Sequence, residues 1–113
     1  MHELSIALSI VDLATQKAQQ AHARRIVEVH LDIGTFSGIE IHALNAALDI
    51  AVRDTMLENA RIQCNRIEAV SECMECGEVF KSEQHFSQCP RCGALNARIL
   101  KGQELQVKSL LVE

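Results

Sequence analysis

At 113 residues, the chain has room for one ordinary domain, or for a domain of about 80 to 90 residues that carries a small insertion. Apolar residues make up 48% of the sequence but aromatic residues only 3%, so any core must be built from aliphatic side chains. Eleven basic side chains against fifteen acidic ones leave a formal net charge of −4. Because the basic residues are scattered, binding of nucleic acid through its phosphates has little electrostatic support.

The first apolar stretch, residues 4–11, is flanked by Glu3 and Asp12, and no lysine or arginine precedes it, unlike in a secretory signal peptide. No apolar run in the sequence approaches the length needed to cross a bilayer. We therefore expect a cytoplasmic protein without a membrane partner. In that setting, the five cysteines indicate thiol and metal chemistry and not a disulfide scaffold.

The periodicity of apolar residues near the amino end predicts a helix over residues 4–22. The residues of its main apolar row are Leu4, Ala7, Leu8, Val11, Ala14 and Ala18. A second row, formed by Ile6, Ile10 and Leu13, predicts extra contact with the core or, as the alternative, a side offered to another protein.

Residues 26–33 alternate apolar and polar side chains, which predicts a strand with one buried face. Ser37 and Glu40 have the spacing of a capping box, which predicts that the next helix starts there. Residues 60–67 predict a second strand, and the order strand, helix, strand favours a parallel pairing of the two strands.

Near the carboxyl end, residues 97–100 and 105–112 predict two more strands, joined around Gly102 as a hairpin. We expect the last strand to return to the first sheet, so that the cysteine segment is an insertion.

The expected fold class is α+β, with two helices packed on a small mixed β-sheet and an inserted four-cysteine zinc-knuckle domain. The expected boundaries place residues 1–69 in the first part of an α/β domain and residues 70–95 in the zinc-binding domain. Residues 96–113 then supply the strands that return to the α/β domain.

Two copies of one turn carry four of the cysteines: Cys73-Met74-Glu75-Cys76-Gly77 and Cys89-Pro90-Arg91-Cys92-Gly93. Each turn offers two thiolates, and its glycine tolerates the positive φ that directs backbone donors at sulfur. Four thiolates make a closed tetrahedral site that suits structural zinc. A redox dithiol pair and an iron–sulfur cluster are the alternatives. Because few bulky apolar residues surround the turns, metal binding would supply much of the folding free energy.

The fifth cysteine, Cys64, lies in the buried register of the predicted strand over residues 60–67. This position favours a small core residue over a catalytic nucleophile. We expect His22, His30 and His42 to be solvated, and likewise His85, for which contact with zinc is the alternative because it lies between the turns.

Four sequence features follow one another in a fixed order along the chain. They are the start Met1-His2-Glu3-Leu4-Ser5, the segment Gly34-Thr35-Phe36-Ser37-Gly38-Ile39-Glu40, the two cysteine turns, and the ending from Gly102 to Glu113. Together they resemble the HypA/HybF family of hydrogenase nickel-incorporation proteins, and the resemblance runs essentially end to end. Two residues depart from the family pattern: Asp54, where we would expect glycine, and Cys64.

The resemblance implies a nickel metallochaperone, not an enzyme, that binds Ni(II) at its amino end and delivers it for maturation of [NiFe]-hydrogenase; some members serve urease. It implies that His2 binds nickel together with the amino group of Met1 and the backbone amides of His2 and Glu3. Such a set is chemically sensible, because Ni(II) favours a planar arrangement of nitrogen donors.

The resemblance also implies two partners, a HypB-type GTPase and the hydrogenase large subunit, and we expect the carrier to be a monomer or a weak homodimer. The nickel would be transient cargo, whereas the zinc would stay in place.

The alternative function is a zinc-ribbon adaptor or nucleic-acid-binding module without nickel delivery. The cysteine turns fit that alternative, but the acidic balance and the lack of aromatic residues for base stacking argue against it. An enzyme that uses Cys64 or the zinc is disfavoured, because four thiolates leave zinc no open position.

Overall fold

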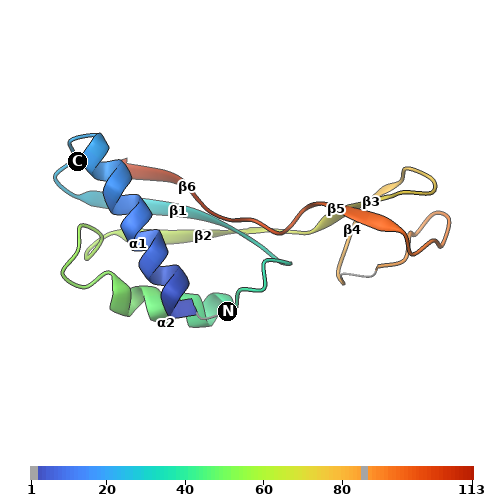
Figure 1. Ribbon diagram of the computed structural model, residues 1–113, viewed down its shortest axis with the longest axis horizontal. Helices are drawn as coiled ribbons and strands as arrows, with labels where there is room; N and C mark the ends of the chain where they lie inside the picture. The colour runs from blue at the N-terminus through green and yellow to red at the C-terminus, as the bar shows by residue number, and fades with distance from the viewer. Residues whose placement is uncertain (1–2, 85–86) are drawn as a thin grey trace. The chain divides into compact units, whose positions relative to one another are not determined.

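The computed structural model describes residues 3–84 and 87–113 and divides the chain into two compact units (Figure 1). Unit 1 comprises the described residues up to Asp32, together with Ile39–Asn65 and Gln106–Glu113. Unit 2 comprises Ile33–Gly38 and Arg66–Leu105.

Unit 1 contains two helices that pack on each other, α1 (Glu3–Gln20) and α2 (Ile41–Ala51). The predicted helix over residues 4–22 is confirmed, with slightly different ends. Both predicted apolar rows contribute to the buried side, which consists of Ile6, Ala7, Ile10, Val11, Ala14 and Ala18. Leu4, Leu8 and Leu13 instead stay exposed to solvent.

The start of α2 differs from the predicted capping box. Glu40 is itself the N-cap residue, and its carboxylate accepts hydrogen bonds from the backbone N–H of His42 at 3.2 Å and of Ala43 at 2.6 Å. The prediction that Ser37 caps this helix is therefore wrong. Ser37 instead lies in a turn, where its backbone N–H donates to the carbonyl of Gly34 at 3.0 Å.

The sheet of unit 1 has the strand order β2-β1-β6, formed by β1 (Ile26–Gly34), β2 (Arg61–Ile67) and β6 (Leu105–Val112). Figure 1 shows α1 crossing these strands. At the carboxyl ends of β1 and β2, the N–H of Thr35 donates to the carbonyl of Ile67 at 2.9 Å, so these two strands run parallel as predicted. β6 runs antiparallel to β1, because Gly34 bonds to Glu104 at one end and Arg25 to Glu113 at the other. The sheet is therefore mixed.

The alternation predicted for the first strand places Val29, Leu31 and Ile33 in the core. Asp32, on the opposite face, is nevertheless only 8% exposed. Its carboxylate accepts hydrogen bonds from Asn65 of β2 at 3.2 Å and from Gln106 of β6 at 3.4 Å. One buried acid therefore links all three strands.

Unit 2 contains an antiparallel sheet with the strand order β4-β3-β5, built from β3 (Val70–Cys73), β4 (Val79–Lys81) and β5 (Ala97–Lys101). The hairpin predicted around Gly102 is wrong, because β5 pairs with β3 while β6 pairs with β1. The prediction that the last strand returns to the first sheet is confirmed.

Gly102 lies where three chain segments pass close to one another within unit 2. Its φ is +116°, and a Cβ at this position would lie 2.4 Å from the Cα of Ala69. The carbonyl of Gly102 accepts a hydrogen bond from the N–H of Phe36 at 2.6 Å. Gly102 therefore lets these backbone segments approach closely, because it has no side chain. This is why the glycine between β5 and β6 does not form a hairpin turn.

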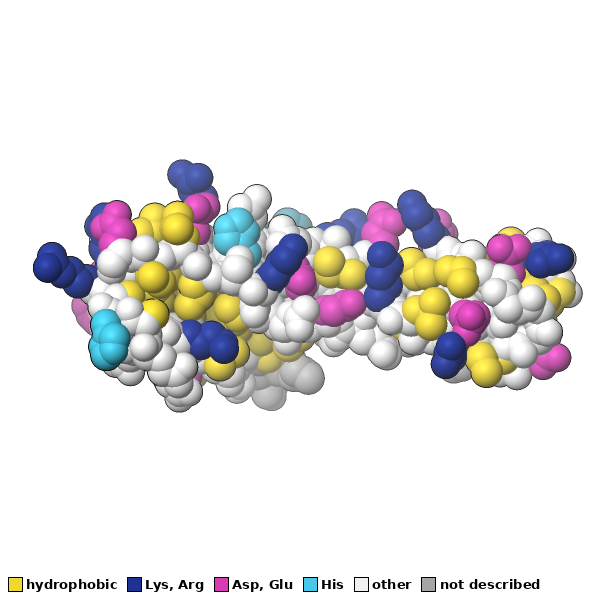
Figure 2. Space-filling model, turned by 90° about the horizontal axis from the view of Figure 1, so that it is seen from above, with side chains coloured by type: hydrophobic (Ala, Val, Ile, Leu, Met, Phe, Trp, Pro, Cys, Tyr) yellow, Lys and Arg dark blue, Asp and Glu magenta, His cyan; other side chains and the backbone are white. Residues whose placement is uncertain are grey.

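The surface mixes charges of both signs. Figure 2 shows acidic and basic side chains interspersed over the face that it presents. Charged side chains of the protein also form ion pairs, as in Lys81 with Glu68 at 3.3 Å and Arg98 with Glu72 at 2.7 Å. Among the helices formed by the described residues, none is long and apolar enough to cross a bilayer.

Candidate metal centre

The two cysteine turns of unit 2 have the same backbone conformation. In the first turn, the N–H of Gly77 donates to the carbonyl of Cys73 at 2.9 Å, and in the second, Gly93 donates to Cys89 at 3.0 Å. Both glycines have positive φ, +80° and +79°, which glycine adopts without steric cost. The repeated sequence thus folds into a repeated structure.

A second pair of hydrogen bonds closes each turn at its base. The N–H of Cys73 donates to Glu78 at 2.8 Å, and the N–H of Cys89 donates to Ala94 at 2.9 Å. The two turns therefore share this second hydrogen bond as well, and the first cysteine of each turn is buried.

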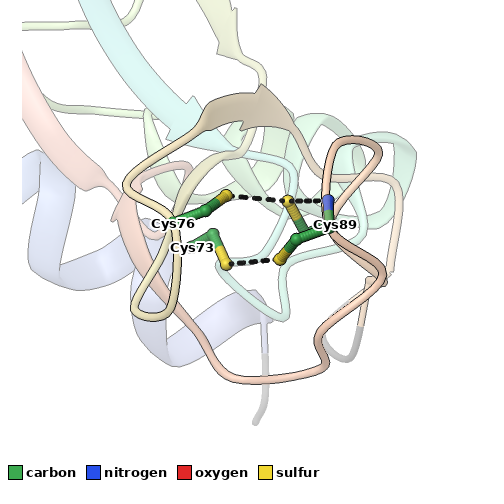
Figure 3. A group of neighbouring side chains, drawn as sticks. Cys73, Cys76 and Cys89 are labelled. Carbon is green, nitrogen blue, oxygen red and sulfur yellow. Dashed lines mark hydrogen bonds between the residues drawn. The ribbon is translucent and has the colours of Figure 1, made fainter.

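The four sulfur atoms of Cys73, Cys76, Cys89 and Cys92 lie within 4.8 Å of one another. Sγ of Cys73 is 3.6 Å from Sγ of Cys92, and Sγ of Cys76 is 3.6 Å from Sγ of Cys89. Figure 3 shows the thiols of Cys73, Cys76 and Cys89 turned toward a common centre from two separate loops. A zinc ion at about 2.3 Å from each of four sulfurs requires sulfur–sulfur separations of about 3.8 Å. The four cysteines therefore fit a tetrahedral zinc ion.

Backbone donors also point at the sulfur atoms. Sγ of Cys73 accepts from the N–H of Glu75 at 3.4 Å. Sγ of Cys89 accepts from Arg91 at 3.4 Å and from Cys92 at 3.5 Å. Such N–H groups stabilise negative charge on a thiolate, as a metal-bound cysteine needs.

The surroundings shift the pKa values of Cys76, Cys89 and Cys92 in different directions. The backbone N–H of Cys92 is the largest of several influences that together lower the pKa of Cys89 to about 7. The N–H of Glu78 lowers the pKa of Cys76, but burial and hydrogen bonding with the other thiols outweigh it and raise that pKa to about 12. The pKa of Cys92 is likewise raised: the amide of Ala94 lowers it, but the Cys73 thiol and burial prevail. A divalent ion would remove this conflict by neutralising the shared charge.

The first turn is supported by Asn96, a residue that the sequence analysis did not single out. The carbonyl of Asn96 accepts a hydrogen bond from the N–H of Met74 at 2.8 Å, and its side-chain amide donates to Glu75 at 3.3 Å. The strands β3 and β4 that hold this turn were also not predicted. The spacing of the cysteines carries no signal for such short strands.

The fifth cysteine does not join the cluster. Cys64 is half-buried, and its thiol lies 3.7 Å from the side-chain oxygen of Asn45. Burial raises the pKa of Cys64. It is therefore an ordinary, partly buried thiol at the edge of the core of unit 1.

The remaining candidate residues fall into two groups. Met1, His2 and His85 lie outside the described residues, so the proposed nickel ligands are represented only by Glu3, the first residue of α1. His22 and His42 are exposed, as predicted. His30 is half-buried beside Glu28, at 3.9 Å. Asp54, where glycine was expected, has a φ of +61°, which explains the preference for glycine there.

The fold and the site together define the class of protein. It is an α+β protein with a separate small antiparallel sheet, and the cysteine turns of that unit form a four-thiolate site that is consistent with zinc. The chain belongs to the HypA family, since the family model described as hydrogenase/urease nickel incorporation, metallochaperone, matches residues 1–112. It is accordingly a nickel metallochaperone of hydrogenase or urease maturation and not an enzyme.

Sequence similarity to known proteins extends over the whole chain. A hydrogenase maturation factor HypA from Parabacteroides distasonis is 45% identical over 113 residues, which cover 100% of this chain and 98% of that protein. A hydrogenase maturation factor HypA from Geobacter metallireducens is 40% identical and covered in full, as is this chain.

Solved structures have the same fold. The solution structure of the Ni metallochaperone HypA from Helicobacter pylori is 25% identical, with a TM-score of 0.71 over 99% of this chain and 97% of that one. A second solution structure, of a HypA protein, is also 25% identical, with a TM-score of 0.74 over 100% of this chain and 97% of that one.

Proposed function

We propose that this chain binds one Ni(II) at its amino end and hands it on for the maturation of [NiFe]-hydrogenase, while Cys73, Cys76, Cys89 and Cys92 hold a structural Zn(II). The observation that carries the proposal is the family match over residues 1–112, which includes the amino end and both cysteine turns. The fit of the four sulfurs to a zinc tetrahedron supports the second half.

The proposed nickel ligands are the imidazole of His2, the amino group of Met1 and the backbone amide nitrogens of His2 and Glu3. Fused chelate rings between an amino terminus and its neighbouring amides suit the planar nitrogen set that Ni(II) favours. Glu3 opens α1, and the N–H groups of a first helical turn have no acceptor within the helix. Binding of nickel to the amide nitrogen of Glu3 would therefore break no helical hydrogen bond.

The proposed partners are a HypB-type GTPase and the hydrogenase large subunit, in the cytoplasm, with urease as a second client. In this proposal the zinc-bearing unit shapes a docking surface and takes no part in nickel chemistry, since four thiolates leave zinc no open position. Coprecipitation of the purified GTPase and large subunit with the full chain tests these partners.

Nickel titration of the untagged, zinc-loaded chain by calorimetry tests the nickel site. We expect one nickel per chain for the unchanged protein, and at least a tenfold weaker affinity, equal to about 1.4 kcal/mol, for His2→Ala. A chain extended before Met1 should show the same loss, because the extension removes the free amine.

The matched control is His22→Asn, at an exposed histidine whose φ is +56°. Asparagine tolerates that backbone conformation, so the control removes an imidazole without strain. It should bind nickel like the unchanged chain. Equal affinity in all three proteins and in the extended chain would refute the amino-terminal site.

A further inference from the structure

Two close sulfur contacts in the cysteine cluster connect the two turns. Cys73 meets Cys92, and Cys76 meets Cys89, each with 3.6 Å between the sulfur atoms. Each contact therefore joins a cysteine of the first turn to one of the second.

The four cysteines also differ in their access to solvent. Cys73 and Cys89 are buried, Cys76 is half-buried, and Cys92 alone of the four is exposed. A small oxidant dissolved in water therefore meets Cys92 first, and the thiol of the buried Cys73 lies 3.6 Å from the Cys92 sulfur.

We propose that Cys92 is the residue at which peroxides oxidise this protein, and that Cys73 resolves the product into a disulfide between the turns. A second disulfide, Cys76–Cys89, follows, and the metal leaves. The proposal assigns to the cluster a peroxide-sensitive release of its ion, and it rests on the proposed zinc occupancy.

The chemistry balances with two molecules of hydrogen peroxide per cluster. The Cys92 thiolate attacks one peroxide oxygen, which gives a sulfenic acid and hydroxide. The Cys73 thiolate then attacks the Cys92 sulfur, forms the S–S bond and expels a second hydroxide. Cys76 and Cys89 then react with a second peroxide in the same two steps. In total, four zinc-bound thiolates and two peroxides give two disulfides, four hydroxide ions and a free Zn(II).

Pairing between the turns starts from sulfur atoms that already lie 3.6 Å apart. A disulfide between the turns closes such a contact to about 2.05 Å, largely by rotation of side chains. The backbone bonds from Gly77 and Gly93 stay in place.

Disulfides between the turns would also replace the zinc ion as a covalent link across the cluster. Such a link limits the freedom of the metal-free segment, so that a thiol reductant and zinc can restore the original site. Disulfides within each turn would leave the two turns unconnected. The connectivity therefore decides whether the two turns stay covalently linked after the metal has left.

Disulfide mapping on the full zinc-loaded chain tests the proposal. Trypsin cleaves after Lys81 and Arg91, and a glutamate-specific protease cleaves after Glu75, so the two proteases together place each of the four cysteines on its own peptide. After stepwise addition of hydrogen peroxide and alkylation of the remaining thiols, mass spectrometry identifies the linked peptides. A chromogenic chelator measures released zinc in parallel.

We expect loss of one zinc per chain for about two peroxide molecules. The peptide containing Cys73 should be linked to that containing Cys92 at the first peroxide equivalent, before Cys76 is linked to Cys89. Dithiothreitol with zinc should restore the metal content. The control Cys64→Ser should change neither the pairing nor the zinc release, because Cys64 lies outside the cluster.

Linkage within the turns, Cys73–Cys76 and Cys89–Cys92, would overturn the proposal. So would sulfinic acids without disulfides, or linkage of Cys76 to Cys89 first. A purified chain without zinc would refute the zinc part of the proposed function instead. In that case the peptide map still decides the pairing, because the sulfur contacts belong to the chain itself.

Discussion

The backbones of Gly34 and Gly102 touch: a Cβ built on Gly34 would lie 2.0 Å from the carbonyl oxygen of Gly102. Hydrogen bonds on both sides of this contact hold the two segments together, from Gly34 to the carbonyl of Glu104 at 2.7 Å and from Phe36 to that of Gly102 at 2.6 Å. Neither segment has room to move aside, because Gly102 in turn lies against Ala69.

Gly34→Ala should therefore destabilise the protein by more than about 2 kcal/mol, through a steric clash with backbone atoms. Urea denaturation measures the free energy of unfolding. The matched control is Gly38→Ala, at a glycine with a φ of +79° and open space around it, where only backbone strain of about 1 kcal/mol is expected. Equal losses in the two variants would contradict the close contact.

The carboxylate of Glu40 should make the stability of α2 depend on pH. Hydrogen bonds from the backbone N–H of Ala43 and then His42 lower the pKa of Glu40 below its ordinary value of 4.5. A lowered pKa in the folded state means that the stabilisation is complete above pH 4.5 and is lost as the pH falls through the folded-state pKa.

Thermal melts of Glu40→Gln and the unchanged chain from pH 7 to pH 2 measure this effect. The difference in Tm should be largest near neutral pH and should shrink in acid. Glu40→Asp should behave like the unchanged chain, because aspartate is a good N-cap residue. A difference in Tm that does not change with pH would show that the charge of Glu40 has no part in the cap.

Asp32→Ala should destabilise unit 1 by about 1–3 kcal/mol, since it leaves the side-chain amides of Asn65 and Gln106 without their acceptor. Denaturation in urea again gives the free energy of unfolding. Asp12→Ala, at an exposed acid of α1, is the control and should change it by less than about 0.5 kcal/mol. Similar values for both variants would mean that the three-strand link contributes nothing.

Removal of zinc should loosen the cysteine turns and spare the core of unit 1. Few apolar side chains order the turns, so metal binding supplies their folding free energy. Amide hydrogen exchange of the chain before and after treatment with a strong chelator checks this, at Gly77 and Gly93 for the turns and at Val52 for α2. Protection of the glycine amides that survives chelation would contradict it.

The sequence predicted the fold well where side-chain periodicity governs it, as in α1 and in β1. It failed where backbone geometry governs the outcome. Gly102 serves a close crossing and not a hairpin turn, and Glu40, not Ser37, caps α2. Both errors came from local sequence motifs. The role of such a motif depends on its contacts with distant parts of the chain, and the local sequence does not reveal those contacts.

The metal centre was predictable because two repeated turns supply four cysteines, one of the ligand sets of structural zinc sites. The supporting strands β3 and β4 were not, since three or four residues carry too little periodicity to identify a strand. The domain boundaries at residues 69, 70, 95 and 96 stay a prediction, as do the nickel ligands.

The most direct test of the nickel account is the X-ray absorption spectrum of the chain loaded with one zinc and one nickel. Nickel held by the amino end should show a planar first shell of nitrogen without sulfur at the nickel edge. The zinc edge should keep four sulfurs at about 2.3 Å. Sulfur in the nickel shell, with zinc displaced from Cys73, Cys76, Cys89 and Cys92, would contradict the account.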